Sequence, residues 1–202
     1  FFYDLTANPV SSALFKFVQG GCSRGKEAQR VMVNSVYDWE KDIVSALREE
    51  GLPVDPLGPL LLSGHKRASL IAEDSGCLGW LDKQPSMSVI YAAFRSNAKI
   101  APEEVQELAL GLEDSRQPFL LVIRPDCVLG NTISDALPMG FLSRTKERGR
   151  VSSWVPQLDV LAHDAIGGFL SHCGWNSTLE AIWNGKPLIG SDALAGLSNV
   201  QT

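Results

Sequence analysis

Short apolar runs separated by helical and turn segments divide most of the chain into a regular series of elements. Four runs are suited to strands buried on both faces of a parallel sheet, at 88–94, 119–123, 150–154 and 166–171. Between the first two, apolar residues of 102–112 recur at helical spacing, behind a proline and two acidic residues that favour a helix start. This alternation of strand and helix predicts an α/β protein with a doubly wound, Rossmann-like parallel sheet and right-handed crossovers.

The N-terminal third of the chain has a different pattern. A strand is expected at 30–35 and a helix at 38–47, whereas residues 1–30 favour loop with one short helix around 13–18. Residues 53–75 begin with three prolines in a segment without regular periodicity, so neither a continuous helix nor a central strand fits there. We therefore predict three parts: the end of one domain (1–52), an interdomain linker (53–75) and a larger second domain (76–202).

Composition and charge restrict the partners of the protein. The 202 residues are 45% hydrophobic and 20% charged, as in soluble globular proteins, and the formal net charge is −5. Without an excess of basic residues, neither nucleic acid nor an anionic membrane surface is an expected partner. The apolar runs are too short to span a bilayer, and no export signal is recognisable. The four cysteines lie far apart, which indicates neither a disulfide framework nor a zinc site and favours the reducing cytoplasm.

Residues 172–180 carry the most specific chemistry, because they follow a buried strand and open a helix. A helix N-terminus offers unpaired N–H groups and a partial positive charge, and Gly174 allows an anion to approach the backbone closely. The side chains of His172, Asn176 and Ser177 add hydrogen-bond donors. Neither a Gly-x-Gly-x-x-Gly sequence nor a Walker sequence is present, which disfavours a dehydrogenase or an ATPase.

The candidate residues in and near this segment also have purely structural interpretations. Ser177 and Glu180 have the spacing of a capping box, but an acidic residue beside a phosphate site can instead hold ribose hydroxyls, and the spacing favours neither. A histidine at a strand end, such as His172, more often has a structural role than a catalytic one. Trp154 and Trp175 would usually be core residues, and stacking on a base is the less common alternative.

A longer pattern around this segment resembles a known family. Its positions are Trp154-Val155-Pro156-Gln157, Leu161, His163, His172-Cys173-Gly174-Trp175-Asn176-Ser177, Glu180, Gly185 and Pro187. Their spacing resembles the donor-binding box of plant UDP-glycosyltransferases, and shorter similarities extend the resemblance back to about residue 31. The resemblance implies a two-domain transferase of the GT-B type that needs no metal and no cofactor, with a UDP-sugar as its co-substrate.

The resemblance also implies a role for each matched residue. Trp154 would stack on uracil, Gln157 would lie beside the base and the ribose, and Glu180 would bind the ribose hydroxyls. The remaining positions would surround the diphosphate and the sugar: Ser96, His172, Gly174, Trp175, Asn176 and Ser177. The implied activity is inverting transfer of a hexose, with glucose expected, to a hydroxyl of a small lipophilic acceptor.

This sequence departs from the family pattern at three places. The family's His-Asp base is expected upstream of residue 1, so no catalytic residue is predicted within the chain. Gly196-Leu197 stand where the box has an Asp-Gln pair that holds the sugar, with Asp192, Asn199 and Gln201 nearby as substitutes. Arg95 replaces a glycine, and its guanidinium could pair with the diphosphate or crowd the loop. The alternative hypothesis is therefore a catalytically incomplete UDP-binding module or a decayed paralogue.

Overall fold

The chain divides into two compact units, Phe1–Arg67 and Ala68–Thr202, and each is described by itself. The structure is a computed structural model that describes residues 20, 24–61, 73–94, 100–124, 127–129 and 132–190. The boundary between the units falls within the range that the sequence predicts as a linker. The helix expected around 13–18 lies outside the described residues.

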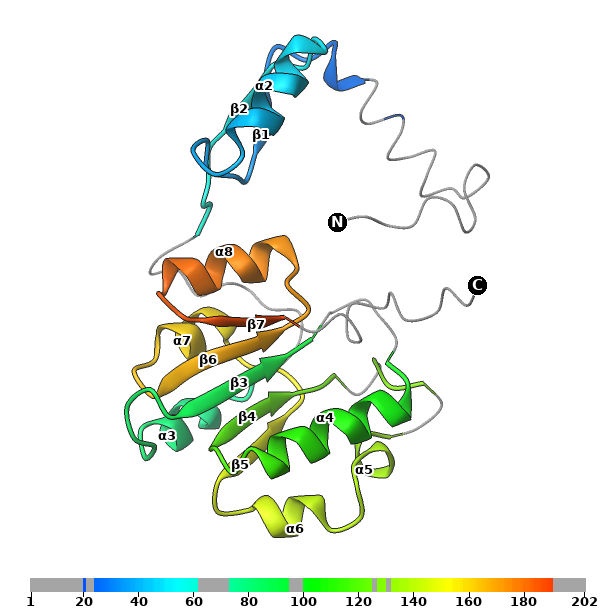
Figure 1. Ribbon diagram of the computed structural model, residues 1–202, viewed down its shortest axis with the longest axis vertical. Helices are drawn as coiled ribbons and strands as arrows, with labels where there is room; N and C mark the ends of the chain where they lie inside the picture. Colours follow the sequence, from blue (N-terminus) through cyan, green and yellow to red (C-terminus); the bar gives the residue numbers. More distant parts are fainter. Residues whose placement is uncertain are drawn as a thin grey trace. The chain divides into compact units, whose positions relative to one another are not determined.

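The first unit contains a small β-α-β arrangement (Figure 1). Strand β1 (Val31–Val33) pairs in parallel with β2 (Val54–Pro56), and α2 (Lys41–Glu49) connects them. The strand and the helix predicted at 30–35 and 38–47 are confirmed. Strand β2 was not predicted, because one proline precedes it and another ends it, and prolines mark an irregular segment.

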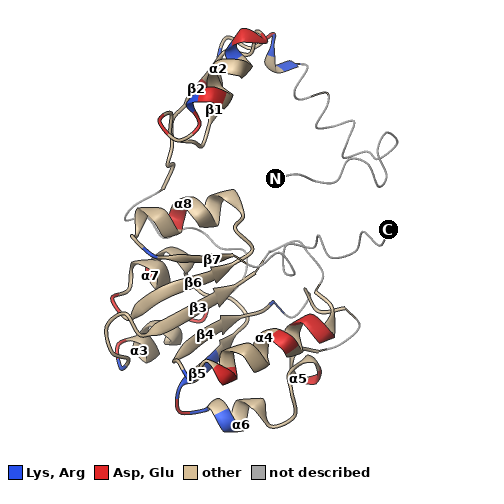
Figure 2. Ribbon diagram, viewed as in Figure 1, with Lys and Arg blue, Asp and Glu red and all other residues tan. Residues whose placement is uncertain are grey.

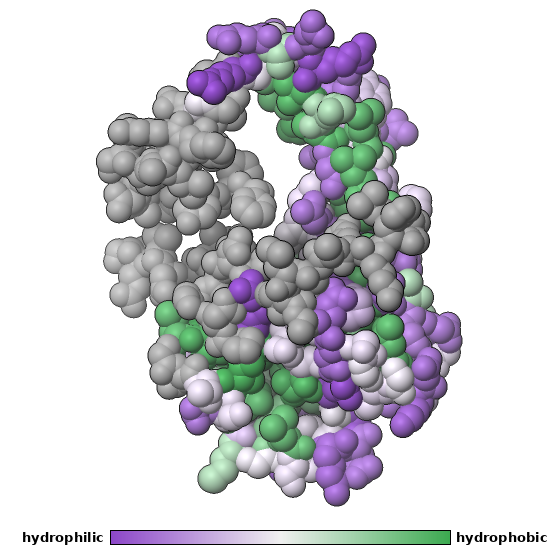
Figure 3. Space-filling view, turned by 180° about the vertical axis from the view of Figure 1, so that it is seen from behind, coloured by the Kyte–Doolittle hydropathy of each residue, from purple (hydrophilic) through white to green (hydrophobic). Residues whose placement is uncertain are grey.

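Much of the apolar surface of the first unit faces outward. Among its described residues the buried hydrophobic side chains are Val44 and Val54. Hydrophobic residues instead gather on its surface (Figure 3), and more than half of the side-chain area is exposed at Met32, Trp39, Ile43, Leu57 and Leu60. Hydrophobic burial among the described residues of this unit therefore contributes little to its stability.

The second unit is built on a parallel sheet in the order β5-β4-β3-β6-β7. Its strands are β3 (Val89–Ala93), β4 (Phe119–Val122), β5 (Gly149–Ser152), β6 (Ile166–Ser171) and β7 (Leu188–Gly190). The four strands predicted from apolar runs are confirmed. Strand β7 was not predicted, because a three-residue edge strand carries too short a pattern to be recognised.

Helices cover both faces of this sheet, as the doubly wound prediction requires (Figure 1). One face packs against α4 (Pro102–Asp114), α5 (Ile133–Ala136) and α6 (Phe141–Thr145), and the other packs against α3 (Gly76–Leu81), α7 (Gln157–Ala162) and α8 (Trp175–Trp183). The aromatic pairs Phe119–Phe141 and Tyr91–Phe169 lie in these two cores, respectively. Helix α4 begins as predicted, with Glu104 accepting a hydrogen bond from the N–H of Ala101.

The surface of the described elements offers no concentrated positive charge. Basic residues lie scattered among acidic and uncharged ones (Figure 2). Within the described ranges, no helix combines the length and the apolar character that crossing a membrane requires.

The strand order places the turning point of the chain between β3 and β6. From β3 the chain moves outward through β4 to β5, and it then returns to β6 on the other side of β3. The carboxyl ends of adjacent parallel strands diverge into a crevice at such a point, where α/β proteins bind ligands. The loop that follows β6, residues 172–174, lies at this edge, whereas residues 95–99 after β3 lie outside the described residues.

The pairing of β3 with β6 contains a bulge. Val89 pairs with Ile166, but Ile90 pairs with Gly168, so Gly167 is an extra residue in β6. A Cβ atom at Gly167 would lie 2.2 Å from the backbone oxygen of Met87. The bulge therefore requires a residue without a side chain at this position.

Replacing Gly167 with alanine should destabilise the second unit. We expect Gly167→Ala to lower the free energy of unfolding by about 1–3 kcal/mol, because the new Cβ cannot move away from fixed backbone. Gly168→Ala is the control, since a Cβ there would meet its nearest neighbours at 3.8 and 3.9 Å. Denaturant unfolding of both variants measures the difference, and equal stability would show that the bulge accommodates a methyl group.

Candidate functional site

The residues that the sequence singles out follow the carboxyl ends of two strands of the second unit. Trp154 lies in the loop between β5 and α7, and Gln157 is the first residue of α7. His172 lies in the loop between β6 and α8. Ser96 and Arg95, together with the positions 192–201 considered for sugar binding, lie outside the described residues. The described part of the site is therefore formed by the loops after β5 and β6.

The N-terminus of α8 is arranged as an anion site requires, but its cap differs from the predicted one. Gly174 is the N-cap residue, and no side chain caps the helix. Trp175, Asn176 and Ser177 form the first turn, in which Trp175 and Asn176 are exposed. The capping-box interpretation is therefore wrong, because Ser177 lies inside the helix. The backbone N–H groups and the positive end of the helix dipole face the edge of the sheet.

His172 packs directly against the start of this helix. A Cβ atom at position 174 would lie 2.4 Å from Nε2 of His172, so any side chain there would force the imidazole to move. Cys173, between them, has a φ of 54°, in the left-handed region that non-glycine residues seldom adopt. This tight turn holds a histidine side chain beside the first N–H groups of α8.

A buried hydrogen-bond network joins α7, α8 and β3. Gln157 Nε2 donates to Oε2 of Glu180 at 2.7 Å and to the hydroxyl of Ser177 at 3.2 Å. Gln157 Oε1 accepts a hydrogen bond from the hydroxyl of Tyr91 at 3.0 Å. Glu180 is only 4% exposed, which is unusual for a carboxylate and explains why it has such partners. Three predicted site residues, Gln157, Ser177 and Glu180, are thus brought together.

Electrostatics fix the protonation of the tyrosine in this network. Burial raises the pKa of Tyr91 far above its ordinary value, and the nearby negative charge of Glu180 raises it further. The phenol therefore stays protonated and remains a hydrogen-bond donor throughout the physiological range.

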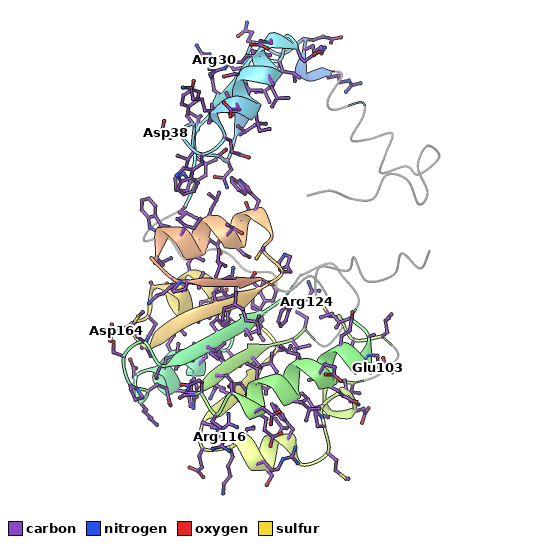
Figure 4. The ribbon with its side chains drawn as sticks, viewed as in Figure 1. Arg30, Asp38, Glu103, Arg116, Arg124 and Asp164 are labelled. Atoms are coloured by element: carbon purple, nitrogen blue, oxygen red, sulfur yellow. The ribbon has the colours of Figure 1, made fainter. Side chains whose placement is uncertain are left out.

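Two contacts hold Trp154, one to its ring and one to its backbone. The guanidinium carbon of Arg124 lies 5.8 Å from the centre of the indole ring, a cation–π distance. Figure 4 shows Arg124 at the edge where β4 ends. The backbone N–H of Asp74 donates to the carbonyl oxygen of Trp154 at 2.8 Å. The indole is therefore positioned from β4 and from the segment that precedes α3.

Asp74 is itself held by charge. Its carboxylate accepts two hydrogen bonds from Nη2 of Arg150, one of them 2.8 Å long, and another from the hydroxyl of Ser152. Burial would raise the pKa of Asp74, but the hydrogen bonds from Ser152 and Arg150 and the positive charge of Arg150 outweigh it, so the pKa is lowered. This ion pair connects β5 to the residue that anchors Trp154.

The remaining histidine of the box lies apart from the network. His163 ends α7, where Nε2 contacts Oδ1 of Asp82 at 3.2 Å and Nδ1 accepts from the N–H of Ala165. Both ring nitrogens thus connect local elements, which indicates a structural role. No group of three or more His, Cys, Asp or Glu side chains in the described part of the chain could hold a metal ion.

Sequence reasoning did not identify the residues that support the site. Tyr91 carries a hydroxyl within a strand buried on both faces, where such a group requires a partner, and this signal could have been used. Arg124 follows the buried strand β4, and Arg150 lies within the partly buried edge strand β5. The sequence contains no signal that pairs Asp74 with Arg150, because 76 positions separate them.

Comparison with known proteins identifies close relatives. The sequence model of the family described as UDP-glucoronosyl and UDP-glucosyl transferase matches residues 67–196. UDP-glycosyltransferase 72B1 of Arabidopsis thaliana is 46% identical over 189 residues, which are 87% of this chain and 39% of the relative. 7-Deoxyloganetin glucosyltransferase of Gardenia jasminoides is 42% identical over 193 residues, which are 91% of this chain and 40% of that protein.

Solved structures agree with the sequence comparison. UGT2 of Phytolacca americana, complexed with UDP-2fluoro-glucose and pterostilbene, has a TM-score of 0.71 at 42% sequence identity. The alignment covers 88% of this chain and 38% of the UGT2 chain. TcCGT1 in complex with UDP has a TM-score of 0.74 at 38% identity and covers 89% of this chain and 42% of its own. The chain thus spans about two fifths of the length of these relatives.

The Asp74 ion pair predicts a specific dependence of stability on pH. Because folding lowers the pKa of Asp74, the stabilisation is complete above the ordinary value of 3.8 and is lost as the pH falls through the lower folded value. We expect Asp74→Asn to reduce the free energy of unfolding by about 1–2 kcal/mol at pH 7. The difference between variant and wild type should shrink below pH 3.8.

Urea unfolding between pH 7 and pH 3 measures this difference. Asp159→Asn, at an exposed position of α7, is the control and should leave the stability unchanged. A constant difference between Asp74→Asn and wild type across the range would contradict the proposed charge interaction.

Proposed function

Because the chain belongs to the UDP-glucuronosyl and UDP-glucosyl transferase family, and specifically resembles its plant members, we propose that it binds a UDP-sugar at the edge of its second unit. The whole protein would transfer a hexose, which we propose to be glucose, to a hydroxyl of a small lipophilic acceptor. One observation carries this proposal: Gln157, Ser177 and Glu180 meet beside the uncapped N-terminus of α8.

The nucleoside half of the ligand would lie between the loop after β5 and helix α8. Trp154 offers an indole face to uracil, while Arg124 covers part of the ring and limits its rotation. Glu180 supplies a carboxylate that accepts hydrogen bonds from ribose hydroxyls, and Gln157 lies next to it. Stacking and carboxylate recognition would thus act on the base and the ribose separately.

The diphosphate would lie against the first turn of α8. The backbone N–H groups there and the helix dipole favour a negative charge. His172 and Asn176 lie at the same helix start, and the hydroxyl of Ser177, which accepts a bond from Gln157, keeps its own hydrogen for donation. Ser96 would approach the phosphates from the loop after β3, and Gly174 and Trp175 would contact the donor through their backbone.

These groups have a direct mechanistic use in an inverting displacement. As the acceptor oxygen attacks the anomeric carbon, the bond to the β-phosphate oxygen breaks and negative charge builds up on UDP. Donors fixed at the helix start stabilise that charge without reorganising, so they lower the barrier more than they stabilise the bound donor. The helix dipole and the donors would replace a metal cation in this role.

The relatives support the acceptor class and the choice of sugar. One binds UDP-2fluoro-glucose and pterostilbene, and a UDP-glucosyltransferase from Polygonum tinctorium is capable of glucosylating indoxyl. Since this chain spans about two fifths of such proteins, these properties are proposed for the complete protein. We propose a cytoplasmic location, which the wide spacing of the four cysteines in the sequence favours.

Calorimetry with UDP tests the nucleotide site. We expect the 202-residue chain to bind UDP, and His172→Ala to weaken binding about tenfold or more, since a donor to a charged phosphate is lost. His163→Ala removes a histidine outside the network and should leave the affinity unchanged. Circular dichroism of both variants is the control for correct folding.

The same titration separates the two hypotheses for the donor site. Tighter binding of UDP-glucose than of UDP would support a transferase site that holds the sugar. Equal affinities would support a UDP-binding module without sugar recognition, and no binding of UDP by a folded sample would overturn the proposed function.

Stacking on Trp154 has its own test. Trp154→Leu should weaken UDP binding by about 1–3 kcal/mol, because the leucine loses the aromatic contact with the base. The matched control is Trp183→Leu, since Trp183 is 60% exposed near the end of α8. Fluorescence quenching by UDP should likewise be reduced in the first variant and persist in full in the second; the reverse pattern would place the base elsewhere.

A further inference from the structure

The proposed nucleotide roles leave one polar group of the site unexplained, the hydroxyl of Tyr91. Its side chain is 1% exposed, and its ring stacks on Phe169 with the ring centres 4.8 Å apart and an interplanar angle of 16°. A phenylalanine would preserve that stacking. The hydroxyl adds a hydrogen bond of 3.0 Å to Oε1 of Gln157, and it lies too deep in the core to bind a ligand itself.

The directions of the hydrogen bonds in this network follow from the chemistry of its members. The Glu180 carboxylate is an acceptor at 2.7 Å, so the amide nitrogen of Gln157 must face it. A flipped amide would place Oε1 against the carboxylate, and two acceptors would repel each other. Oε1 therefore faces Tyr91, whose hydroxyl must supply the hydrogen.

The amide of Gln157 is consequently held at both ends. Both hydrogens of Nε2 are used, one toward Glu180 and one toward the hydroxyl of Ser177, while Oε1 receives the hydrogen of Tyr91. Fixing the amide fixes the position of the carboxylate oxygen to which it donates. Tyr91 can thus influence the position of Glu180 without contacting it, because the side chain of Gln157 is hydrogen-bonded to both.

We propose that Tyr91 is a positioning residue for ribose recognition, which acts through Gln157 to orient the carboxylate of Glu180. This inference rests on the proposed function, in which Glu180 binds the ribose hydroxyls. It assigns to the central strand β3 a part in distinguishing ribose from deoxyribose. Stacking of the base on Trp154 and contact of the diphosphate with the backbone N–H groups of α8 do not involve Gln157, so these contributions to binding are independent of Tyr91.

The test compares the affinities of the 202-residue chain for UDP and for 2′-deoxy-UDP. The ratio of the two dissociation constants isolates recognition of the 2′-hydroxyl from the base and the diphosphate. We expect Tyr91→Phe to reduce this ratio about two- to tenfold, the effect of one hydrogen bond, with most of the change in the affinity for UDP.

A matched variant separates this role from a general loss of stability. Thr145→Val also removes a buried hydroxyl in α6, which donates to the carbonyl oxygen of Phe141 at 2.8 Å on the face of the sheet opposite the network. It should lower stability but leave the ratio unchanged. If Tyr91→Phe weakens both nucleotides equally, the hydroxyl has a structural role only and the proposal is overturned.

A second variant tests whether Tyr91 acts through Gln157. Gln157→Met keeps the length of the side chain but removes the amide, so it should reduce the ratio at least as much as Tyr91→Phe. The double variant should then show no further reduction, because the two residues form one pathway. Additive effects of the two substitutions would overturn the proposal.

The outcomes also distinguish this proposal from the proposed function. If Tyr91→Phe does not fold, an unchanged ratio in Gln157→Met would be sufficient to reject the positioning role. A wild-type chain that binds both nucleotides equally would reject ribose recognition while supporting a UDP site. A folded wild-type chain that binds neither nucleotide would reject the proposed function itself.

Discussion

The pairing of β3 with β6 is the interaction on which the second unit and its site both depend. These two strands lie at the centre of the parallel sheet, and their inward-facing rings, Tyr91 and Phe169, stack in one of the two cores. Burying each such ring contributes about 2–3 kcal/mol of hydrophobic stabilisation. Because α8 leaves directly from β6, the same pairing that stabilises the sheet also fixes where the positive end of that helix lies.

The polar side chains of the site are held by partners that come from several elements. Gln157 joins α7 to α8 and to β3, while Asp74 ties the segment before α3 to β5 and to the backbone of Trp154. Each partner restricts a side chain before any ligand arrives, which lowers the conformational entropy that binding would otherwise remove. The donor site thus resembles other preorganised sites, in which a supporting layer of hydrogen bonds sets the geometry of the contacting groups.

Much of the fold could be predicted from the sequence, because fully buried strands leave continuous apolar runs. The doubly wound sheet of the GT-B type is confirmed by the strand order and by the solved relatives. Strand β2 escaped prediction because prolines mark its segment as irregular, and β7 because a short edge strand carries no distinctive pattern. Spacing alone could not locate the cap of α8, since a serine at capping-box spacing looks the same whether it caps the helix or lies three residues after the cap.

The candidate site was predictable only where its residues are close in the sequence. The helix start at 174–177 and the Trp154–Gln157 segment could be recognised locally, whereas the contributions of Tyr91 and Asp74 depend on contacts between distant strands. Side-chain partners at such separations are decided by strand order and register. Neither composition nor periodicity encodes these two properties.

The bulge at Gly167 has a consequence for how the length of β6 can change during evolution. In a regular strand Ile166 and Phe169 would point to opposite faces, because they are three residues apart, yet both lie in the same core. The extra residue restores the alternation of side chains between the two faces of the sheet. The side chains of β6 therefore point to the same faces as their partners in β3 on both sides of the bulge. A deletion or an insertion of one residue would turn part of the strand over. Length variation in this strand should therefore occur in pairs of residues, or at the bulge itself.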